Sequence, residues 1–145
     1  MTPWRADVVR IAQEWLRTPF LPRACAKGRG CDCGSFLAGV YAEAGVLPAL
    51  ALGRYDYAGP ALRGDDVYLR TALAHADAIP EAAIQPGDFV LYRMGRAFAH
   101  GALVVRWPHF VLHAVRGAGV IGADGVGGML RGRERQAFAL KGTPC

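Results

Sequence analysis

The hydrophobic pattern of this chain changes at residues 84–88, and that change constrains the fold more than any other feature. Before it, apolar residues recur at helical spacing in three segments, 5–17, 33–43 and 66–76. After it, short apolar or alternating runs predict strands at 89–92, 101–107, 110–115, 120–121 and 136–140. Helices followed by strands, with short connections, predict an α+β fold in which N-terminal helices pack on an antiparallel sheet of about five strands.

Local signals define the ends of the predicted helices. Thr18-Pro19 predicts the end of the first helix, because proline disfavours helix at the preceding residue and cannot continue the hydrogen-bond ladder. Asp32 occupies the N-cap position of the second helix, and Gly45 is a natural stop after it. Asp65 or Asp66 is expected to cap the third helix. Segments 20–32 and 48–65 are predicted to be loops.

Length and composition predict a single domain spanning residues 1–145. Hydrophobic residues make up 52% of the chain, but no window approaches the roughly 20 consecutive apolar residues of a membrane-spanning helix. No apolar segment follows Arg5, so we expect no secretory signal peptide. The chain is therefore expected to act inside the cell, or to leave it by a route other than general export.

The formal net charge of +5 favours an anionic partner without identifying it. The basic residues occur in pairs and triplets, and no aromatic residues alternate with them as in nucleic-acid-binding proteins. We therefore expect no nucleic-acid partner. A negatively charged cell wall or a carboxylate-bearing peptide fits the charge equally well.

The four cysteines are unevenly distributed, because Cys25, Cys31 and Cys33 lie within nine positions and Cys145 lies at the end. Without an export signal, reduced thiols are the expected state. A zinc site built from these three cysteines and a histidine is the alternative. Cys-x-Cys without a second ligand pair fits structural zinc poorly, so no metal is predicted.

Cys33 differs from the other cysteines because it opens the second predicted helix. A helix N-terminus favours the thiolate, and the Cys33 backbone N–H can donate to an oxyanion there. His100 and His113 lie on the second and third predicted strands, which a tight turn at 107–109 joins. Cys33 as nucleophile, His100 as base and His113 as its orienting partner form a workable triad. His75 and His109 receive no role.

Four segments resemble, in order and spacing, the motifs of the NlpC superfamily of papain-like cell-wall cysteine peptidases. They are DCGSF at 32–36, IQPGDFV at 84–90, AHGALV at 99–104 and FVLHA at 110–114. RTPF at 17–20 is similar to the family's Gly-Thr-Pro-Tyr, although Phe20 lacks the tyrosine hydroxyl. The loop at 24–30 and the ending RQAF at 135–138 resemble the branch carried on the tails of phages and gene transfer agents.

This resemblance implies a peptidoglycan hydrolase that uses a Cys33–His100–His113 triad and no cofactor. It implies cleavage of the stem peptide between D-glutamate and the diamino acid. It also places Asp32, Ser35, Arg23 and Phe20 beside the substrate. The branch implies synthesis in the cytoplasm, tail proteins as partners, and action at the cell wall after delivery on a particle. The alternatives are an amidase or acyltransferase on the same scaffold, and a tail-assembly module with little activity.

Overall fold

The computed structural model of the chain describes residues 1–48 and 67–141. The helices of this part are α1 (Pro3–Glu14), α2 (Cys33–Glu43) and α4 (Val67–His75). The strands of the main sheet are β3 (Ala76–Ile79), β4 (Phe89–Met94), β5 (Ala97–Arg106), β6 (Phe110–Val115), β7 (Gly119–Ala123) and β8 (Arg135–Leu140). A separate hairpin contains β1 (Cys25–Ala26) and β2 (Gly30–Cys31). Short 3₁₀ turns occupy Glu81–Ala83 and Gly128–Leu130.

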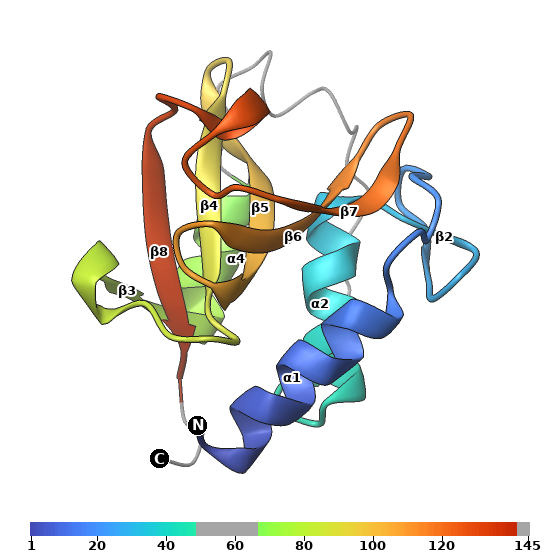
Figure 1. Cartoon of the computed structure of the whole chain (residues 1–145), viewed down its shortest axis with the longest axis horizontal. Coiled ribbons are helices and arrows are strands. Elements are labelled where there is room, and N and C mark those ends of the chain that lie inside the picture. The colour runs from blue at the N-terminus through green and yellow to red at the C-terminus, as the bar shows by residue number, and fades with distance from the viewer. Residues whose placement is uncertain (49–66, 142–145) are drawn as a thin grey trace.

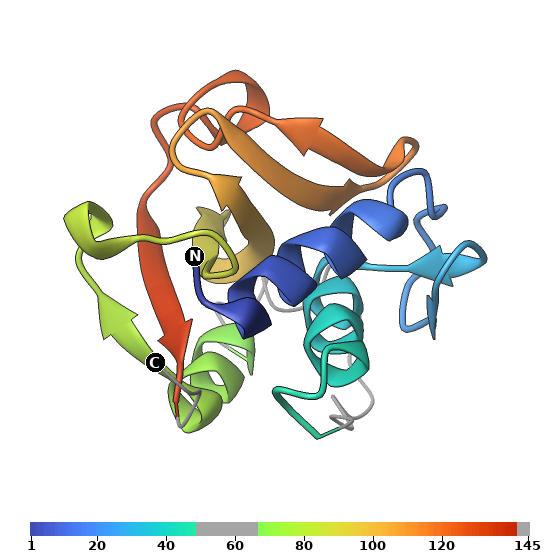
Figure 2. The same cartoon turned by 60° about the horizontal axis from the view of Figure 1, so that its bottom comes forward.

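The main sheet has the strand order β3-β8-β4-β5-β6-β7, and every neighbouring pair is antiparallel. Figure 1 shows α1 and α2 together beside the sheet, and α4 near strands β4 and β5. Figure 2 shows α1 crossing next to α2, with the β1–β2 hairpin beyond them. The predicted α+β fold with an antiparallel sheet is confirmed.

Two apolar clusters lie on opposite faces of the sheet, because successive strand side chains alternate. Leu103 and Leu112 face the helices and pack with Val8, Phe36 and Val40. The side chains that point to the other face belong to a second cluster, which consists of Val90, Tyr92, Ala102, Val104, Val111, Leu130 and Ala137. Among the described residues, Leu130 of the 3₁₀ turn Gly128–Leu130, rather than any helix residue, packs in this second cluster.

The predicted bounds of α2 and β6 match the structure, whereas the first helix ends earlier than predicted. It stops at Glu14 instead of residue 17, and Arg17 has a positive φ of 72°. The reason is tertiary: the Arg17 N–H donates to the Val120 carbonyl, and the Val120 N–H donates to the Thr18 carbonyl. These bonds to β7 replace the last helical turn.

The prediction of an uninterrupted loop over 20–32 was wrong, because it contains the β1–β2 hairpin. Strand β3 was also missed, and Ala76, predicted to be helical, opens that strand. Its four residues are stabilised mainly by pairing with β8, which no local pattern reveals. The proposed caps Asp65 and Asp66 lie outside the described residues, as does segment 49–66 of the predicted loop and helix.

The second predicted strand begins earlier than expected, so His100 is an interior residue of β5. The β4–β5 register pairs Tyr92 with His100 and then Arg93 with Phe98. Ala99 is the extra residue of this β-bulge and has no partner in the register. The bulge places an irregular backbone segment next to His100.

Candidate active site

Cys33 is the first residue of α2, and a capping box fixes this helix start. The Ser35 N–H donates to Asp32 Oδ1 at 2.9 Å, and the Asp32 N–H donates to Ser35 Oγ at 2.9 Å. Asp32 Oδ2 also accepts from the Arg23 N–H at 2.7 Å. The predicted capping role of Asp32 is confirmed, and the same carboxylate holds the preceding loop in place.

The thiol of Cys33 contacts the bulge in β5. Its Sγ lies 3.6 Å from the carbonyl oxygen of Ala99, within the range of an S–H···O hydrogen bond. Ala99 directly precedes His100 in the chain. The bulge therefore brings the N-terminus of α2 to the part of β5 that carries His100.

His100 and His113 contact each other across strands β5 and β6. His100 Nε2 lies 2.8 Å from His113 Nδ1, and the two ring planes meet at 75°. The sequence left open whether the two histidines share a face, and this contact resolves that question. Since one of the two nitrogens must carry the shared proton, each ring restricts the tautomer and orientation of the other.

All three candidate residues are buried: Cys33 is 0%, His100 4% and His113 1% exposed. Burial, together with the nearby charges of His113 and Arg133, lowers the pKa of His100 to about 3. Burial also lowers the pKa of His113 to about 4. Both imidazoles are therefore neutral at neutral pH, which leaves a ring nitrogen able to accept a proton.

These lowered pKa values predict a loss of stability in mild acid. The unfolded chain binds protons on its histidines near pH 6.5, while the folded chain binds them only near pH 3–4. The contribution of the two neutral histidines to the free energy of unfolding is therefore fully present above pH 6.5. It falls as the pH drops, by on the order of 2 kcal/mol per histidine by pH 5. Urea unfolding at pH 7 and pH 5 measures this difference.

The variant His113→Gln should have a smaller stability difference between pH 7 and pH 5 than the wild type. The exposed His109 offers a matched control, and His109→Gln should keep the wild-type difference. An equal pH dependence in His113→Gln and wild type would contradict the assignment of acid sensitivity to the buried pair.

The four residues predicted to lie beside the substrate differ in their burial and in their contacts. Asp32 and Ser35 are buried, and their described hydrogen bonds hold the helix start and the loop before it. The Arg23 side chain is exposed, and its backbone has a positive φ of 66°. Phe20 is half-buried against the core and forms a parallel bridge with Cys31.

Solved structures share this architecture. The NlpC/p60 domain of the peptidoglycan hydrolase SagA superposes with a TM-score of 0.64 at 16% identity, over 94% of this chain and 98% of that one. A Staphylococcus aureus Mu50 protein described as similar to a lipoprotein of the NLP/P60 family superposes with a TM-score of 0.67 at 15% identity, over 97% of this chain and 42% of that one. NlpC2 from Trichomonas vaginalis superposes with a TM-score of 0.61 at 16% identity, over 95% of this chain and 49% of that one. The chain has the NlpC/p60 fold.

At these identities the likeness establishes the fold alone, and the chain spans less than half the length of two of these three structures. No protein-family model matches the sequence, and no curated protein matches it. The roles of individual residues in this NlpC/p60 fold must therefore come from the chain's own geometry.

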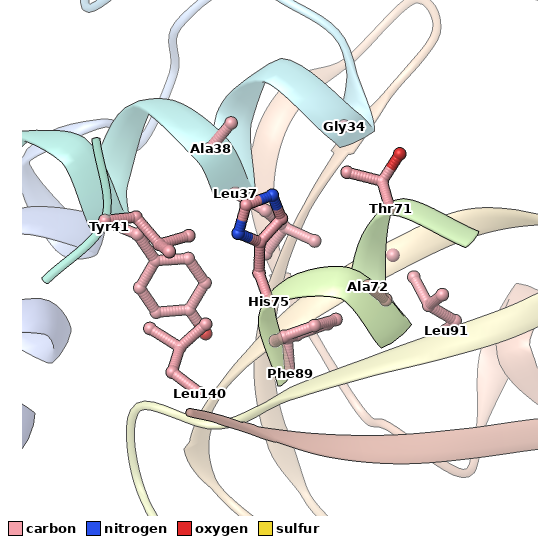
Figure 3. Close-up of a pocket in the computed structure, with 12 residues that line it drawn as sticks. Gly34, Leu37, Ala38, Tyr41, Thr71, Ala72, His75, Phe89, Leu91 and Leu140 are labelled. Carbon is pink, nitrogen blue, oxygen red and sulfur yellow. The ribbon is translucent and has the colours of Figure 1, made fainter. Parts of the chain in front are cut away.

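A small apolar pocket with a volume of about 60 Å³ lies between α2 and α4 over the sheet (Figure 3). Gly34 and Gly101 line it, and they are the residues that directly follow Cys33 and His100. Leu37, Tyr41 and Leu91 contribute to its apolar wall, and His75 on α4 also lines it. His75, to which the sequence gave no role, thus borders a pocket next to the candidate site.

Sequence reasoning also missed two neighbours of His100. The Tyr92 ring centre lies 6.4 Å from that of His100, and its hydroxyl donates to the Gly125 carbonyl at 2.8 Å. Arg133 is close enough for its positive charge to lower the His100 pKa. Tyr92 ends a predicted strand, but only the β4–β5 register places it opposite His100.

Within residues 1–48 and 67–141, no three side chains of metal-binding type are grouped to hold a metal ion. In the same part of the chain, no helix is both long enough and apolar enough to cross a membrane.

Proposed function

We propose that the chain is a cysteine hydrolase that cleaves amide bonds in the peptides of bacterial peptidoglycan. The observation that supports this proposal most strongly is the buried contact of 2.8 Å between His100 and His113, next to a cysteine at a helix N-terminus. Neutral imidazoles paired in this way are suited to accept and return a thiol proton.

In the proposed reaction, Cys33 Sγ attacks the substrate carbonyl while His100 takes the thiol proton at Nδ1. The His100 Nε2–H then donates to His113 Nδ1, which stabilises the imidazolium form. His100 next gives its proton to the leaving amine, and a thioester with Cys33 remains. Water attacks the thioester with His100 as base, which releases the acid and restores the thiol. The Cys33 amide, in the first turn of α2, would donate to the oxyanion.

The finer assignment rests on the sequence motifs. Their resemblance to NlpC peptidases supports cleavage between D-glutamate and the diamino acid. The loop at 24–30 and the ending at 135–138 support delivery to the cell wall on the tail of a phage or gene transfer agent. Mass spectrometry of purified tailed particles tests the delivery, which requires this chain to copurify with tail proteins.

Digestion of purified peptidoglycan, followed by mass analysis of the fragments, tests the function. Wild-type chain should release fragments cut after D-glutamate, and Cys33→Ala should be at least ~10³-fold slower. Cys145→Ala is the matched control and should retain the wild-type rate. Stem peptides beginning at L-alanine would instead indicate an amidase. Equal cleavage rates in wild type and Cys33→Ala would refute Cys33 as the nucleophile, and no cleavage by the wild type would indicate a tail-assembly module.

The apolar pocket favours acyl transfer as a second candidate function. It is bounded by Gly34 and Gly101, so an apolar acyl group held there would lie close to Cys33. Faster release of nitrophenol from a medium-chain 4-nitrophenyl ester than from the acetate ester, with peptidoglycan left uncut, would favour this candidate over the peptidase.

A further inference from the structure

Cys25 and Cys31 lie directly opposite each other in the hairpin that precedes the nucleophile segment. The register pairs Cys25 with Cys31 and Ala26 with Gly30. Directly opposite residues of an antiparallel pair place their side chains on the same face. The two thiols therefore occupy neighbouring positions on one side of the hairpin.

The backbone hydrogen bonds of Cys31 show which kind of pair this is. The Cys31 N–H donates to the Pro19 carbonyl at 3.0 Å, and its carbonyl accepts from the Leu21 N–H at 2.9 Å. Both groups are thus turned away from Cys25, so Cys25 and Cys31 form a non-hydrogen-bonded pair. Such pairs have Cα atoms about 4.5 Å apart, which lies within the range that a disulfide spans.

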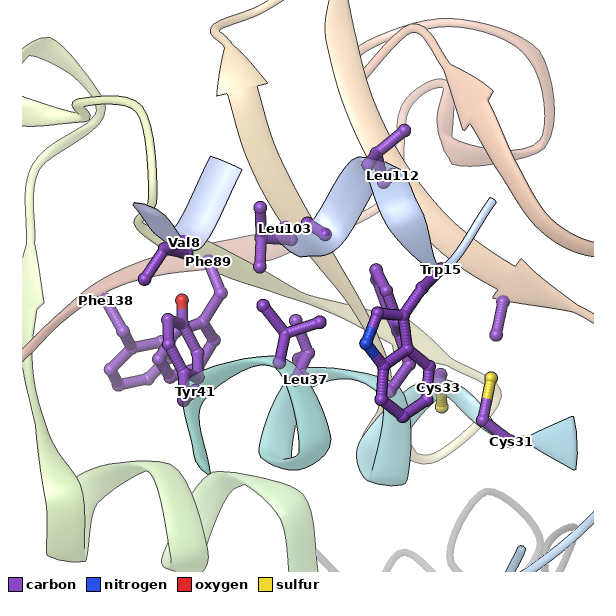
Figure 4. Close-up of a cluster of buried hydrophobic side chains, with 14 of the residues drawn as sticks. Val8, Trp15, Cys31, Cys33, Leu37, Tyr41, Phe89, Leu103, Leu112 and Phe138 are labelled. Carbon is purple, nitrogen blue, oxygen red and sulfur yellow. The ribbon is translucent and has the colours of Figure 1, made fainter. Parts of the chain in front are cut away.

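Contacts of the sulfur atoms with α2 and the core agree with this arrangement. Cys25 Sγ lies 3.4 Å from the Ser35 carbonyl oxygen, and a Cβ built at Gly39 would come within 3.0 Å of the same sulfur. Cys31 is fully buried in the core cluster that includes Trp15 and Phe36. Figure 4 shows Cys31 and Cys33 near Trp15 at one end of that cluster. Both sulfurs of the hairpin thus lie on its α2 side.

We propose that Cys25 and Cys31 form a disulfide bond under oxidising conditions and leave the Cys33 thiol free. Cys25 is exposed and Cys31 is buried, so an external disulfide reaches Cys25 first. The Cys25 thiolate attacks that disulfide, forming a mixed disulfide and expelling one thiol. The Cys31 thiolate then attacks Cys25 Sγ and expels the second thiol, so two protein thiols are oxidised while one external disulfide is reduced.

Cys33 is a less suitable partner for Cys31. Only Asp32 separates them, and the capping box holds Asp32 in place with two bonds to Ser35. A Cys31–Cys33 bond would have to displace Asp32 from this capping box, whereas a Cys25–Cys31 bond leaves the box intact. Since Asp32 Oδ2 already ties Arg23 to the helix start, the disulfide would add a covalent closure to the loop that positions Cys33.

The thiol pKa values set the conditions of the reaction. Burial and the charge of Asp32 raise the pKa of Cys25. Burial, with the charge of Asp32 and the neighbouring thiols, raises the pKa of Cys31 to about 12. Little thiolate exists at neutral pH, so oxidation by glutathione disulfide should be faster at pH 8.5 than at pH 7.

Peptide mapping without reduction tests the proposal, because trypsin sites at Arg23, Lys27 and Arg29 separate Cys25 from Cys31 and Cys33. After treatment with glutathione disulfide and alkylation, peptide 24–27 should be linked to peptide 30–54, and the link should persist in Cys33→Ala. Absence of the link, a bond within peptide 30–54, or loss of the link in Cys33→Ala would overturn the proposal.

Thermal unfolding provides a second measurement that does not depend on a buried substitution. Oxidation should raise the Tm of wild type by roughly 5 °C and that of Cys25→Ser not at all. Cys145→Ser is the matched control and should show the wild-type increase. An equal Tm increase in Cys25→Ser and wild type would also contradict the proposal.

Discussion

His100→Gln is expected to lower kcat/KM on peptidoglycan peptides by ~10³- to 10⁴-fold. Glutamine keeps much of the volume and polarity of histidine, but it cannot take the proton of Cys33 or return one to the leaving amine. The His100 contact with His113 is buried, so water cannot easily replace the missing base. Initial rates on defined stem peptides, with far-UV circular dichroism as a check on folding, measure this loss.

The double variant Cys33→Ser/His100→Gln distinguishes a shared mechanism from two independent losses. Residues that act as one nucleophile–base unit are strongly non-additive, so the double variant should be about as slow as the slower single variant. His109→Gln is the control and should keep the wild-type rate. A double variant that loses the product of the two single factors would contradict the proposed unit.

His113→Asn should give a smaller loss, because His113 orients His100 without touching the substrate. The expected reduction in kcat/KM is ~10- to 100-fold, with KM nearly unchanged and kcat lowered. Loss of binding, seen as a raised KM with unchanged kcat, would place His113 in substrate recognition instead.

The start of α2 could be predicted from sequence because all its signals are local. The cap Asp32, the apolar stripe and the stop at Gly45 lie within one short segment, and the observed helix has the predicted bounds. The strand β6 was equally well marked by its apolar run. Strand β3 had no such signal, because its existence depends on pairing with the distant β8.

The geometry around His100 could not be predicted for the same reason. The bulge at Ala99 arises from the β4–β5 register, and a one-residue shift of register moves every side chain to the other face. The lack of an export signal likewise predicted reduced thiols without indicating which of them are neighbours, whereas the β1–β2 register places Cys25 opposite Cys31. Sequence therefore identified candidate side chains, and pairing between strands determined which of them meet.

The largest stability effect is expected at a buried ion pair that joins α1 to the start of β4. Arg5 Nη1 donates to Asp88 Oδ1 at 2.8 Å and to the Pro86 carbonyl at 2.9 Å. Asp88 Oδ2 accepts from the Gln85 N–H at 2.8 Å. The sequence gave Arg5 and Asp88 no shared role, because 83 positions separate them.

Arg5→Met should lower the free energy of unfolding by ~3–5 kcal/mol at pH 7, because it leaves the Asp88 carboxylate buried without its cation. Arg10→Met is the matched control on the same helix. The carboxylate partners of Arg10, Glu14 and Asp7, are exposed, so its loss should cost under ~1 kcal/mol. Urea unfolding of both variants and the wild type measures the two differences.

The loss of unfolding free energy in Arg5→Met should depend on pH, and this dependence identifies the cause of the loss. Burial already raises the pKa of Asp88, and the Gln85 N–H and Arg5 oppose that rise. Without Arg5 the folded-state pKa rises further, so the folded variant takes up a proton at a higher pH than the unfolded chain does. The penalty should therefore be full at pH 7–8 and shrink as the pH falls toward 4.

The double variant Arg5→Met/Asp88→Asn should recover part of the lost stability at pH 7, because it removes the buried charge along with its partner. A pH-independent penalty, with no recovery in the double variant, would attribute the effect to lost packing of the Arg5 stem. The ion pair therefore predicts both a pH-dependent loss of stability in Arg5→Met and a partial recovery in the double variant. Comparing Arg5→Met with and without Asp88→Asn distinguishes the effect of the buried charge from that of lost packing.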